Sequence, residues 1–224
     1  MEKVFSRDGI VVTADQALLT CGALAGPLYI TLGVLQMLVR PGFDPTRHDL
    51  SLMSNGDLGW IQISNFVVTG LLVIAGALGM RHVLRGSRGG TWGPLLVGIY
   101  GLGLIGAGIF VADPALGFPP GTPADAHEVS IHGLLHFVTG GLGFLALIAA
   151  CFVFARRFRV LQQRGWAIYS VITGIVFFAA FFGIAAGSQL GGSVLVFVTL
   201  AFTAAVVSTW LWISAIFLRL MKTQ

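Results

Sequence analysis

The feature that most constrains the fold of this chain is a series of six apolar segments, each long enough to cross a lipid bilayer. They cover about residues 17–39, 60–80, 91–112, 130–155, 166–188 and 193–217. At about 1.5 Å of helical rise per residue, each would extend roughly 30–39 Å, enough to span the hydrocarbon core. Only helices and closed barrels satisfy their backbone hydrogen bonds in lipid, and segments of this length indicate helices. The sequence therefore predicts an all-α integral membrane protein, a six-helix transmembrane bundle forming one domain over residues 1–224.

The composition supports membrane insertion and argues against a nucleic-acid partner. Hydrophobic residues make up 56% of the chain and charged residues only 10%, whereas soluble proteins usually carry about 25% charged residues. The net charge of +4 comes from basic residues that flank the apolar segments, as juxtamembrane anchors do. They form no basic patch interleaved with aromatic residues, so we expect the lipid bilayer to be the partner and no nucleic acid.

The distribution of the basic residues predicts the orientation of the bundle. Arg40 and Arg47 lie in the loop after the first segment, and the other basic residues lie on the opposite side. These others are Lys3, Arg7, Arg81, Arg85, Arg88, Arg156, Arg157, Arg159, Arg164, Arg219 and Lys222. By the positive-inside rule both termini face the cytoplasm, as expected for a multi-pass protein of the bacterial inner membrane.

The first outer loop, about residues 40–59, is predicted to contain a short interfacial helix. Asp44-Pro45 is typical of a helix N-cap followed by proline at the first helical position. The helix would cover residues 46–54 and end at Asn55-Gly56. Its apolar residues Leu50 and Met53 would lie on the membrane or close the end of the bundle.

Histidine, aspartate and serine residues gather at the predicted outer end of the bundle. His132 and His136 lie one helical turn apart in the fourth segment, a spacing that can chelate a transition metal such as zinc. Asp113 follows the third segment at a similar depth and could supply a third ligand. His48 and Ser51 from the first outer loop would add an acid–base group and a hydroxyl that orients water or stabilises an oxyanion.

Three interpretations of this cluster stay open. In the first, the residues are structural, and His136 bonds Asp113 or a backbone carbonyl. In the second, Asp113, His136, His48 and Ser51 form a metal-free catalytic site. In the third, His132, His136 and Asp113 hold zinc. The His-x-x-x-His spacing recurs by chance and lacks the glutamate that follows the first histidine of zincins.

Three stretches of the chain resemble one family. They are Arg47-His48-Asp49-Leu50-Ser51-Leu52-Met53-Ser54 followed by Gly59-Trp60, then Phe110-x-x-Asp113-Pro114, and Ser130-x-His132-Gly133-x-x-His136. The family is the bacterial membrane family known as domain of unknown function 998, and the resemblance covers nearly the whole chain. It implies a six-helix inner-membrane protein without an established activity. Its pattern marks the outer-loop serine, Asp113 and His136 more strongly than His132.

A looser likeness connects the serine, the aspartate and the His-x-x-x-His pair to transmembrane hydrolases that include alkaline ceramidases and adiponectin-receptor-like proteins. Those proteins differ from this chain in helix count and motif order, so the likeness is an analogy only.

Three functional hypotheses follow, and whether the protein is an enzyme stays open. The first, favoured by the gathering of His, Asp and Ser, is a hydrolase or transferase acting on a lipid-like substrate. The second is a carrier or ligand-binding module for a small amphiphile, although the chain shows no charged residue at mid-membrane depth and no evident inverted repeat. The third is a non-catalytic membrane partner or sensor. The sequence does not specify an oligomeric state.

Overall fold

Six long helices form the chain in the computed structural model, which describes residues 3–5, 11–126, 128–188 and 190–223. The helices are α1 (Ala14–Val39), α2 (Gly59–Val83), α3 (Trp92–Ile109), α4 (Ile131–Val160), α5 (Arg164–Gly187) and α6 (Gly192–Met221). All six are long and apolar enough to span a membrane, which confirms the predicted bundle. Arg7, one of the basic residues used to predict the orientation, lies outside the described residues.

The helix ends differ from the apolar segments in two informative places. α4 continues to Val160, because the arginines after residue 155 extend the helix beyond its apolar run. α3 ends at Ile109, because Phe110 adopts an extended backbone with φ −97° and ψ 100°. Asp113 therefore lies in the loop after α3.

A short β-hairpin that was not predicted precedes α1. Strands β1 (Lys3–Phe5) and β2 (Val11–Thr13) pair in antiparallel orientation just before the helix. Thr13 then caps α1 through a capping box: its hydroxyl accepts from the backbone N–H of Gln16, and the Gln16 side chain accepts from the backbone N–H of Thr13, both at 3.2 Å. Both bonds satisfy backbone donors that the first helical turn leaves free.

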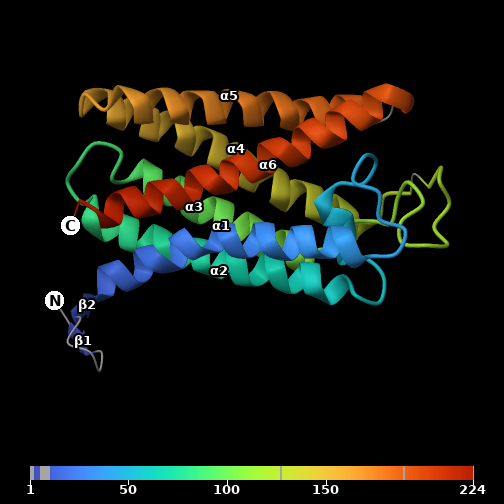
Figure 1. Cartoon of the computed structure of the whole chain (residues 1–224), viewed down its shortest axis with the longest axis horizontal. Helices are drawn as coiled ribbons and strands as arrows, with labels where there is room; N and C mark the ends of the chain where they lie inside the picture. The colour runs from blue at the N-terminus through green and yellow to red at the C-terminus, as the bar shows by residue number, and fades with distance from the viewer. Residues whose placement is uncertain (1–2, 6–10, 127, 189, 224) are drawn as a thin grey trace.

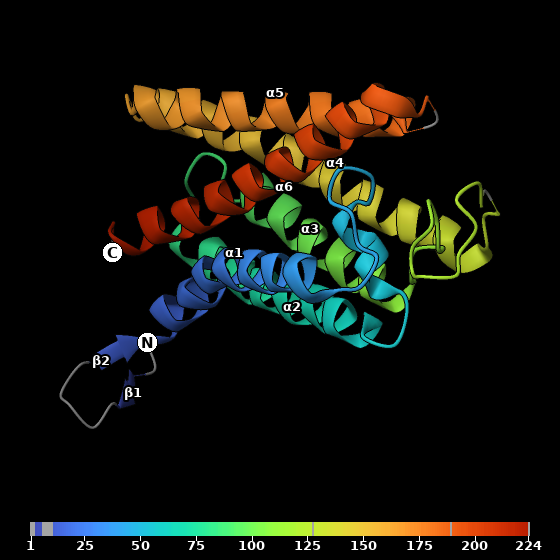
Figure 2. The same cartoon turned by 45° about the vertical axis from the view of Figure 1, so that its right-hand side comes forward.

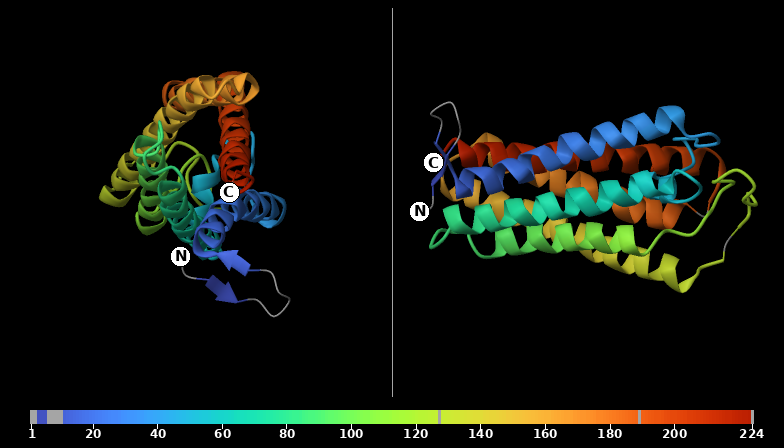
Figure 3. Two further views of the ribbon diagram at one scale, coloured as in Figure 1. Left: turned by 90° about the vertical axis from the view of Figure 1, so that its left-hand side faces the viewer. Right: turned by 90° about the horizontal axis from the view of Figure 1, so that it is seen from below.

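The helices form a ring in chain order. Each helix packs against the next, and α6 packs back against α1 (Figure 3). Both termini lie at one end, called here the terminal end (Figure 1). The long loops 40–58 and 110–130 lie at the opposite end, called the loop end. Most histidine and aspartate side chains considered above are therefore at the loop end, as predicted.

Glycine pairs set the closest helix contacts. A Cβ added to Gly70 of α2 would lie 2.7 Å from the carbonyl oxygen of Gly101 in α3. A Cβ added to Gly103 would lie 2.8 Å from Cα of Gly143 in α4. These distances leave no room for any side chain, so the glycines allow α2, α3 and α4 to pack backbone against backbone.

The two halves of the bundle are filled differently. Near the terminal end, large side chains such as Trp212, Phe154 and Phe217 are completely buried and fill the ring. α4 lies along α5 at this end and diverges from it toward the loop end (Figure 2). Large apolar side chains also point outward from every helix, for example Leu38 and Phe197, which are 76% and 72% exposed. Such a surface needs lipid to cover it.

The first loop-end segment folds as a 3-10 helix rather than the predicted helix 46–54. The 3-10 helix η1 covers Leu50–Ser54, and Asp49 caps it instead of Asp44. Asp44 forms a separate turn, in which its carboxylate accepts from the backbone N–H and the hydroxyl of Thr46 at 2.9 and 2.7 Å. These bonds lower the pKa of Asp44. Leu50 and Met53 are buried and close the end of the bundle.

Candidate functional site

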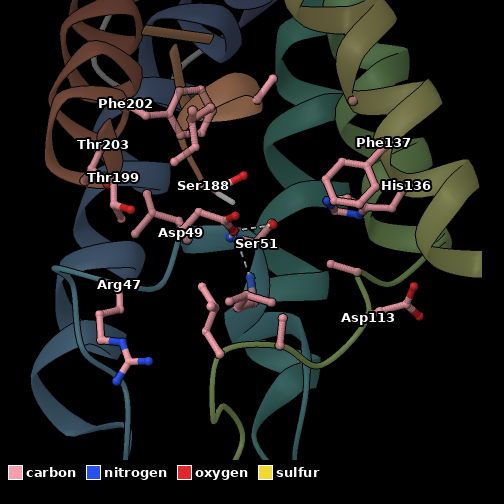
Figure 4. A pocket seen from close by; sticks show the side chains of 18 of the residues that line it. Arg47, Asp49, Ser51, Asp113, His136, Phe137, Ser188, Thr199, Phe202 and Thr203 are labelled. Carbon is pink, nitrogen blue, oxygen red and sulfur yellow. Dashed lines mark hydrogen bonds between the residues drawn. The ribbon is translucent and has the colours of Figure 1, made fainter. Parts of the chain in front are cut away.

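A cavity of about 960 Å³ occupies the loop-end half of the ring. Figure 4 shows His136 and Phe137 of α4 on one side and Thr199 and Phe202 of α6 on the other. Loops 40–58 and 110–130 border its outer end. The volume lies at the upper end of the range for small-molecule sites. The divergence of α4 from α5 leaves this space, because the side chains of the remaining helices do not fill it.

The cavity changes character along its length. Near the loop end it is lined by polar side chains, among them Asp49, Ser51 and His136. Deeper in the bundle, Phe144 and Phe202 form aromatic walls. Along α6 the lining extends from Gly192 to Val206, a helical rise of roughly 21 Å. The cavity is therefore elongated, with charged and polar side chains at its outer end and mainly aromatic side chains, Tyr100 among them, deeper inside.

His136 is buried at the polar end of the cavity, and its tautomer can be assigned. Its Nδ1 lies 3.0 Å from the carbonyl oxygen of Ala107 and 2.8 Å from that of Phe110. Because carbonyl oxygens only accept, Nδ1 carries the proton and donates to both. Ala107 and Phe110 belong to the C-terminal turn of α3, whose carbonyls lack intrahelical partners. The ring therefore caps α3 through its Nδ1–H group.

Asp113 lines the cavity, but its carboxylate is bound to the start of α4. Its two oxygens accept from the backbone N–H of Ser130 at 2.8 Å and from the Ser130 hydroxyl at 2.5 Å. Ser130 in turn caps α4 by accepting from the backbone N–H of Gly133 at 3.0 Å. In Figure 4 the carboxylate points away from Asp49 and Ser51. Of the two partners expected for His136, Asp113 or a backbone carbonyl, the structure shows the carbonyl, and Asp113 binds Ser130 instead.

Ser51 and Asp49 lie between the α4 and α6 walls of the cavity in Figure 4. The Ser51 hydroxyl donates to Asp49 Oδ1 at 2.5 Å. The same oxygen accepts from the backbone N–H groups of Ser51 and Leu52 at 3.0 and 3.3 Å. Opposite them, the Thr199 hydroxyl is buried and has no hydrogen-bond partner among the described residues.

His48 is buried away from the cavity lining and connects the two loop-end segments. Its Nδ1 accepts from the backbone N–H of Asp44 at 2.9 Å, and its Nε2 donates to the carbonyl oxygen of Leu116 at 3.0 Å. Both ring nitrogens are used, so in this conformation His48 has no free position for acid–base chemistry. The catalytic role predicted for His48 stays a prediction, and the structure adds a structural role.

The predicted zinc ligands do not converge. His132 is exposed and packs edge-on against Phe110, with ring centroids 6.0 Å apart. Among the described residues no group of three or more His, Cys, Asp or Glu side chains is placed to hold a metal ion. The set of His132, His136 and Asp113 therefore receives no support from the geometry, since the last two face helix termini instead of each other.

Two polar features were missed by the sequence analysis. The first is a cluster of buried amides between α1 and α2, where Gln36 Nε2 donates to Gln62 Oε1 at 2.8 Å and Asn65 Nδ2 donates to the carbonyl oxygen of Tyr29 at 3.3 Å. Gln36 Oε1, Gln62 Nε2 and Asn65 Oδ1 have no partner among the described residues. Two glutamines and an asparagine inside apolar segments were the available signal, because such amides need partners in a membrane.

The second missed feature is Arg40, which is only 7% exposed. Its guanidinium donates to the carbonyl oxygen of Met53 at 3.0 Å and to that of Asn55, and it lies 5.4 Å from the ring centroid of the buried Phe118. Burial lowers the pKa of Arg40, and Asp57 partly opposes that effect. Arg40 therefore fastens both loop-end segments over the cavity. Its place as the only arginine directly after an apolar segment on that side was the available signal.

Comparisons with known proteins identify a family but no activity. No curated protein and no solved structure matches the chain. The family described as protein of unknown function (DUF998) matches residues 23–219, which include all of the cavity-lining residues. The chain therefore belongs to this family, and its six long helices are apolar enough to cross a membrane.

Proposed function

We propose that the protein binds a lipid-like amphiphile in the loop-end cavity. The observation that carries this proposal is the polarity gradient along the cavity, from Asp49, Ser51 and His136 at the loop end to Phe144 and Phe202 deeper inside. An amphiphile matches both parts, because its polar group can bond the first set while its chain buries apolar area against the second.

The contacts of the polar residues favour binding over catalysis. Asp113 and His48 are occupied by backbone and cap interactions. His136 lines the cavity, and its Nε2 atom has no hydrogen-bond partner among the described residues, so it is left to bond a ligand. A buried polar atom without a partner costs free energy, so a ligand that bonds it is favoured.

The wall that α4 forms supports entry of a ligand into the cavity from the membrane. Phe137 lines the cavity and is also 63% exposed on the outside of α4. α4 diverges from α5 toward the loop end (Figure 2). A ligand in the adjoining leaflet would reach the cavity past this side chain without leaving the apolar phase.

The basic residues predict the side of the membrane on which the cavity lies. The arginine-rich loops and both termini would face the cytoplasm of a bacterial inner membrane, because basic loops are retained on that side. The cavity would then open toward the extracytoplasmic leaflet. Labelling of single cysteines placed in loop 110–130 by an impermeant reagent in intact cells tests this orientation.

A cavity-filling variant tests the proposed binding. A Cβ added to Gly140 of α4 meets no atom within 4 Å, and Gly140 lines the cavity. Gly140→Leu should therefore place its side chain in the space that the ligand needs. Gly183→Leu on α5 is the matched control, since a Cβ there also meets no atom within 4 Å and Gly183 is not part of the lining.

The measurement is saturable binding of a fluorescent fatty acid, cis-parinaric acid, to the full chain in detergent micelles. We expect the natural protein and Gly183→Leu to bind alike and Gly140→Leu to lose binding. Circular dichroism establishes that both variants keep their helices. The proposal is wrong if the natural protein shows no saturable binding or if both leucine variants lose it equally.

A second candidate function is hydrolysis of an ester-bearing amphiphile, favoured by the tautomer of His136. With Nδ1 donating to α3, Nε2 can accept a proton from Ser51 or from water in the same cavity. His136→Asn retains an N–H donor near the position of Nδ1 but removes the base. Turnover of a fatty-acid p-nitrophenyl ester should then disappear while binding of cis-parinaric acid remains, and turnover that survives His136→Asn excludes this role.

A further inference from the structure

A second hollow lies on the outside of the bundle at the terminal end. It has a volume of about 540 Å³ and lies between the last turns of α4 and the first turns of α5. Ala155 and Ala167, both small, belong to its lining, which also includes Phe152, Arg156, Arg159, Ile168, Val171 and Ile172. Because it faces outward and is separate from the loop-end cavity, nothing proposed above uses it.

The hollow combines apolar walls with two cationic side chains. Phe152, Ile168 and Ile172 are 42%, 59% and 54% exposed. Arg156 and Arg159 are exposed near the end of α4, which finishes at Val160. The apolar walls extend from the arginines toward the middle of the membrane span, since Phe152 precedes the arginines on α4 and Ile172 lies further along α5.

The two arginines have no carboxylate partner among the described residues. The ion pair found at this end joins Asp15 to His82 at 2.8 Å. Neighbouring Arg157 instead donates to the Ser87 hydroxyl at 2.8 Å and to the Arg88 carbonyl. Arg156 and Arg159 are three residues apart on one helix, where like charges repel. An anion between them would relieve the repulsion.

We propose that this groove binds an anionic phospholipid, with its phosphate between Arg156 and Arg159 and an acyl chain along the apolar walls. Guanidinium groups match phosphate oxygens through paired N–H donors, and basic pockets between transmembrane helices bind anionic headgroups. A lipid fits better than free phosphate because the groove continues from the arginines as exposed apolar surface.

Native mass spectrometry of the full chain in detergent micelles tests the proposal, with phosphatidylglycerol and phosphatidylcholine of the same acyl chains as probes. We expect phosphatidylglycerol to bind at least about tenfold more tightly than phosphatidylcholine. The doubly substituted variant Arg156→Gln/Arg159→Gln should lose that preference. Arg85→Gln/Arg88→Gln is the matched control, because these two arginines are exposed at the same end but lie outside the groove.

Three results would overturn the assignment. The first is equal binding of the two lipids to the natural protein. The second is an equal loss in the control variant, which would indicate attraction to the general positive charge of this end. The third is full competition by inorganic phosphate, which would indicate a phosphate site without an acyl-chain component. Gly140→Leu should leave the preference for phosphatidylglycerol over phosphatidylcholine unchanged, so this test is independent of the loop-end cavity.

Discussion

The contact between Gly133 and Asp113 makes a sharp prediction about how α4 is held. A Cβ added to Gly133 would lie 1.9 Å from Oδ2 of Asp113 and 2.5 Å from its Cγ. Gly133→Ala must therefore displace the carboxylate that accepts two hydrogen bonds from Ser130, the N-cap of α4. Gly133→Ala should therefore weaken the attachment of loop 110–130 to the first turn of α4 and destabilise both segments.

The expected loss can be worked out from these contacts. Two hydrogen bonds to a carboxylate contribute about 1.5 kcal/mol each at the lower end of their range, which suits their exposed position. The favourable position of the carboxylate at the helix N-terminus adds about 0.5 kcal/mol. The higher helix propensity of alanine returns roughly 0.5–1 kcal/mol. The free energy of unfolding should therefore fall by about 2.5–3 kcal/mol.

The assay is reversible unfolding in mixed micelles with increasing dodecyl sulfate, followed by tryptophan fluorescence. Gly140→Ala is the control, because it makes the same change on the same helix where a Cβ meets no atom within 4 Å. We expect the control to be unchanged or slightly stabilised. In an Asp113→Ala background, Gly133→Ala should cause no further loss. Equal stability of the two alanine variants, or additive losses with Asp113→Ala, would refute the reasoning.

Three further predictions concern the other loop-end contacts. Arg40→Ala should destabilise the protein by about 2–4 kcal/mol, because it leaves the buried carbonyl of Met53 and the partly buried carbonyl of Asn55 unpaired. Arg40→Lys should restore little of this stability, because lysine lacks the fork of donors. Hydrogen exchange over residues 50–55 should rise in both variants. Thr46→Val should raise the pKa of Asp44, measured by carboxyl NMR titration, since the Thr46 hydroxyl is the largest cause of its lowering. Because the pKa of Asp44 is depressed in the folded state, the contribution of Asp44 to stability is present above its unfolded pKa of about 3.9 and is lost as the pH falls through the folded value. Thr46→Val should make this contribution smaller. His136→Ala should cost about 1–3 kcal/mol by unpairing the end of α3, whereas exposed His132→Ala should change stability by less than about 0.5 kcal/mol; both are measured by the same unfolding assay.

The apolar pattern was sufficient to predict the six helices and the gathering of polar residues at the loop end. Backbone hydrogen bonding within a membrane is a local requirement, so a long apolar segment such as residues 193–217 specifies a helix without knowledge of its neighbours. Local cap chemistry was less reliable. Asp44-Pro45 has the sequence of an N-cap, yet Asp49 caps η1, because Leu50 and Met53 must turn inward to close the bundle.

The use of each polar side chain could not be read from the order of residues. His132 and His136 share a helix, but the packing of α4 against α3 buries one against free carbonyls and leaves the other exposed. The cavity likewise depends on the angle at which α4 leaves α5 (Figure 2). Helix rotation and crossing angle result from contacts between segments far apart in sequence, such as Gly103 against Gly143. The chain order thus specifies which residues reach the loop end, and the assembled ring determines which of them face the cavity.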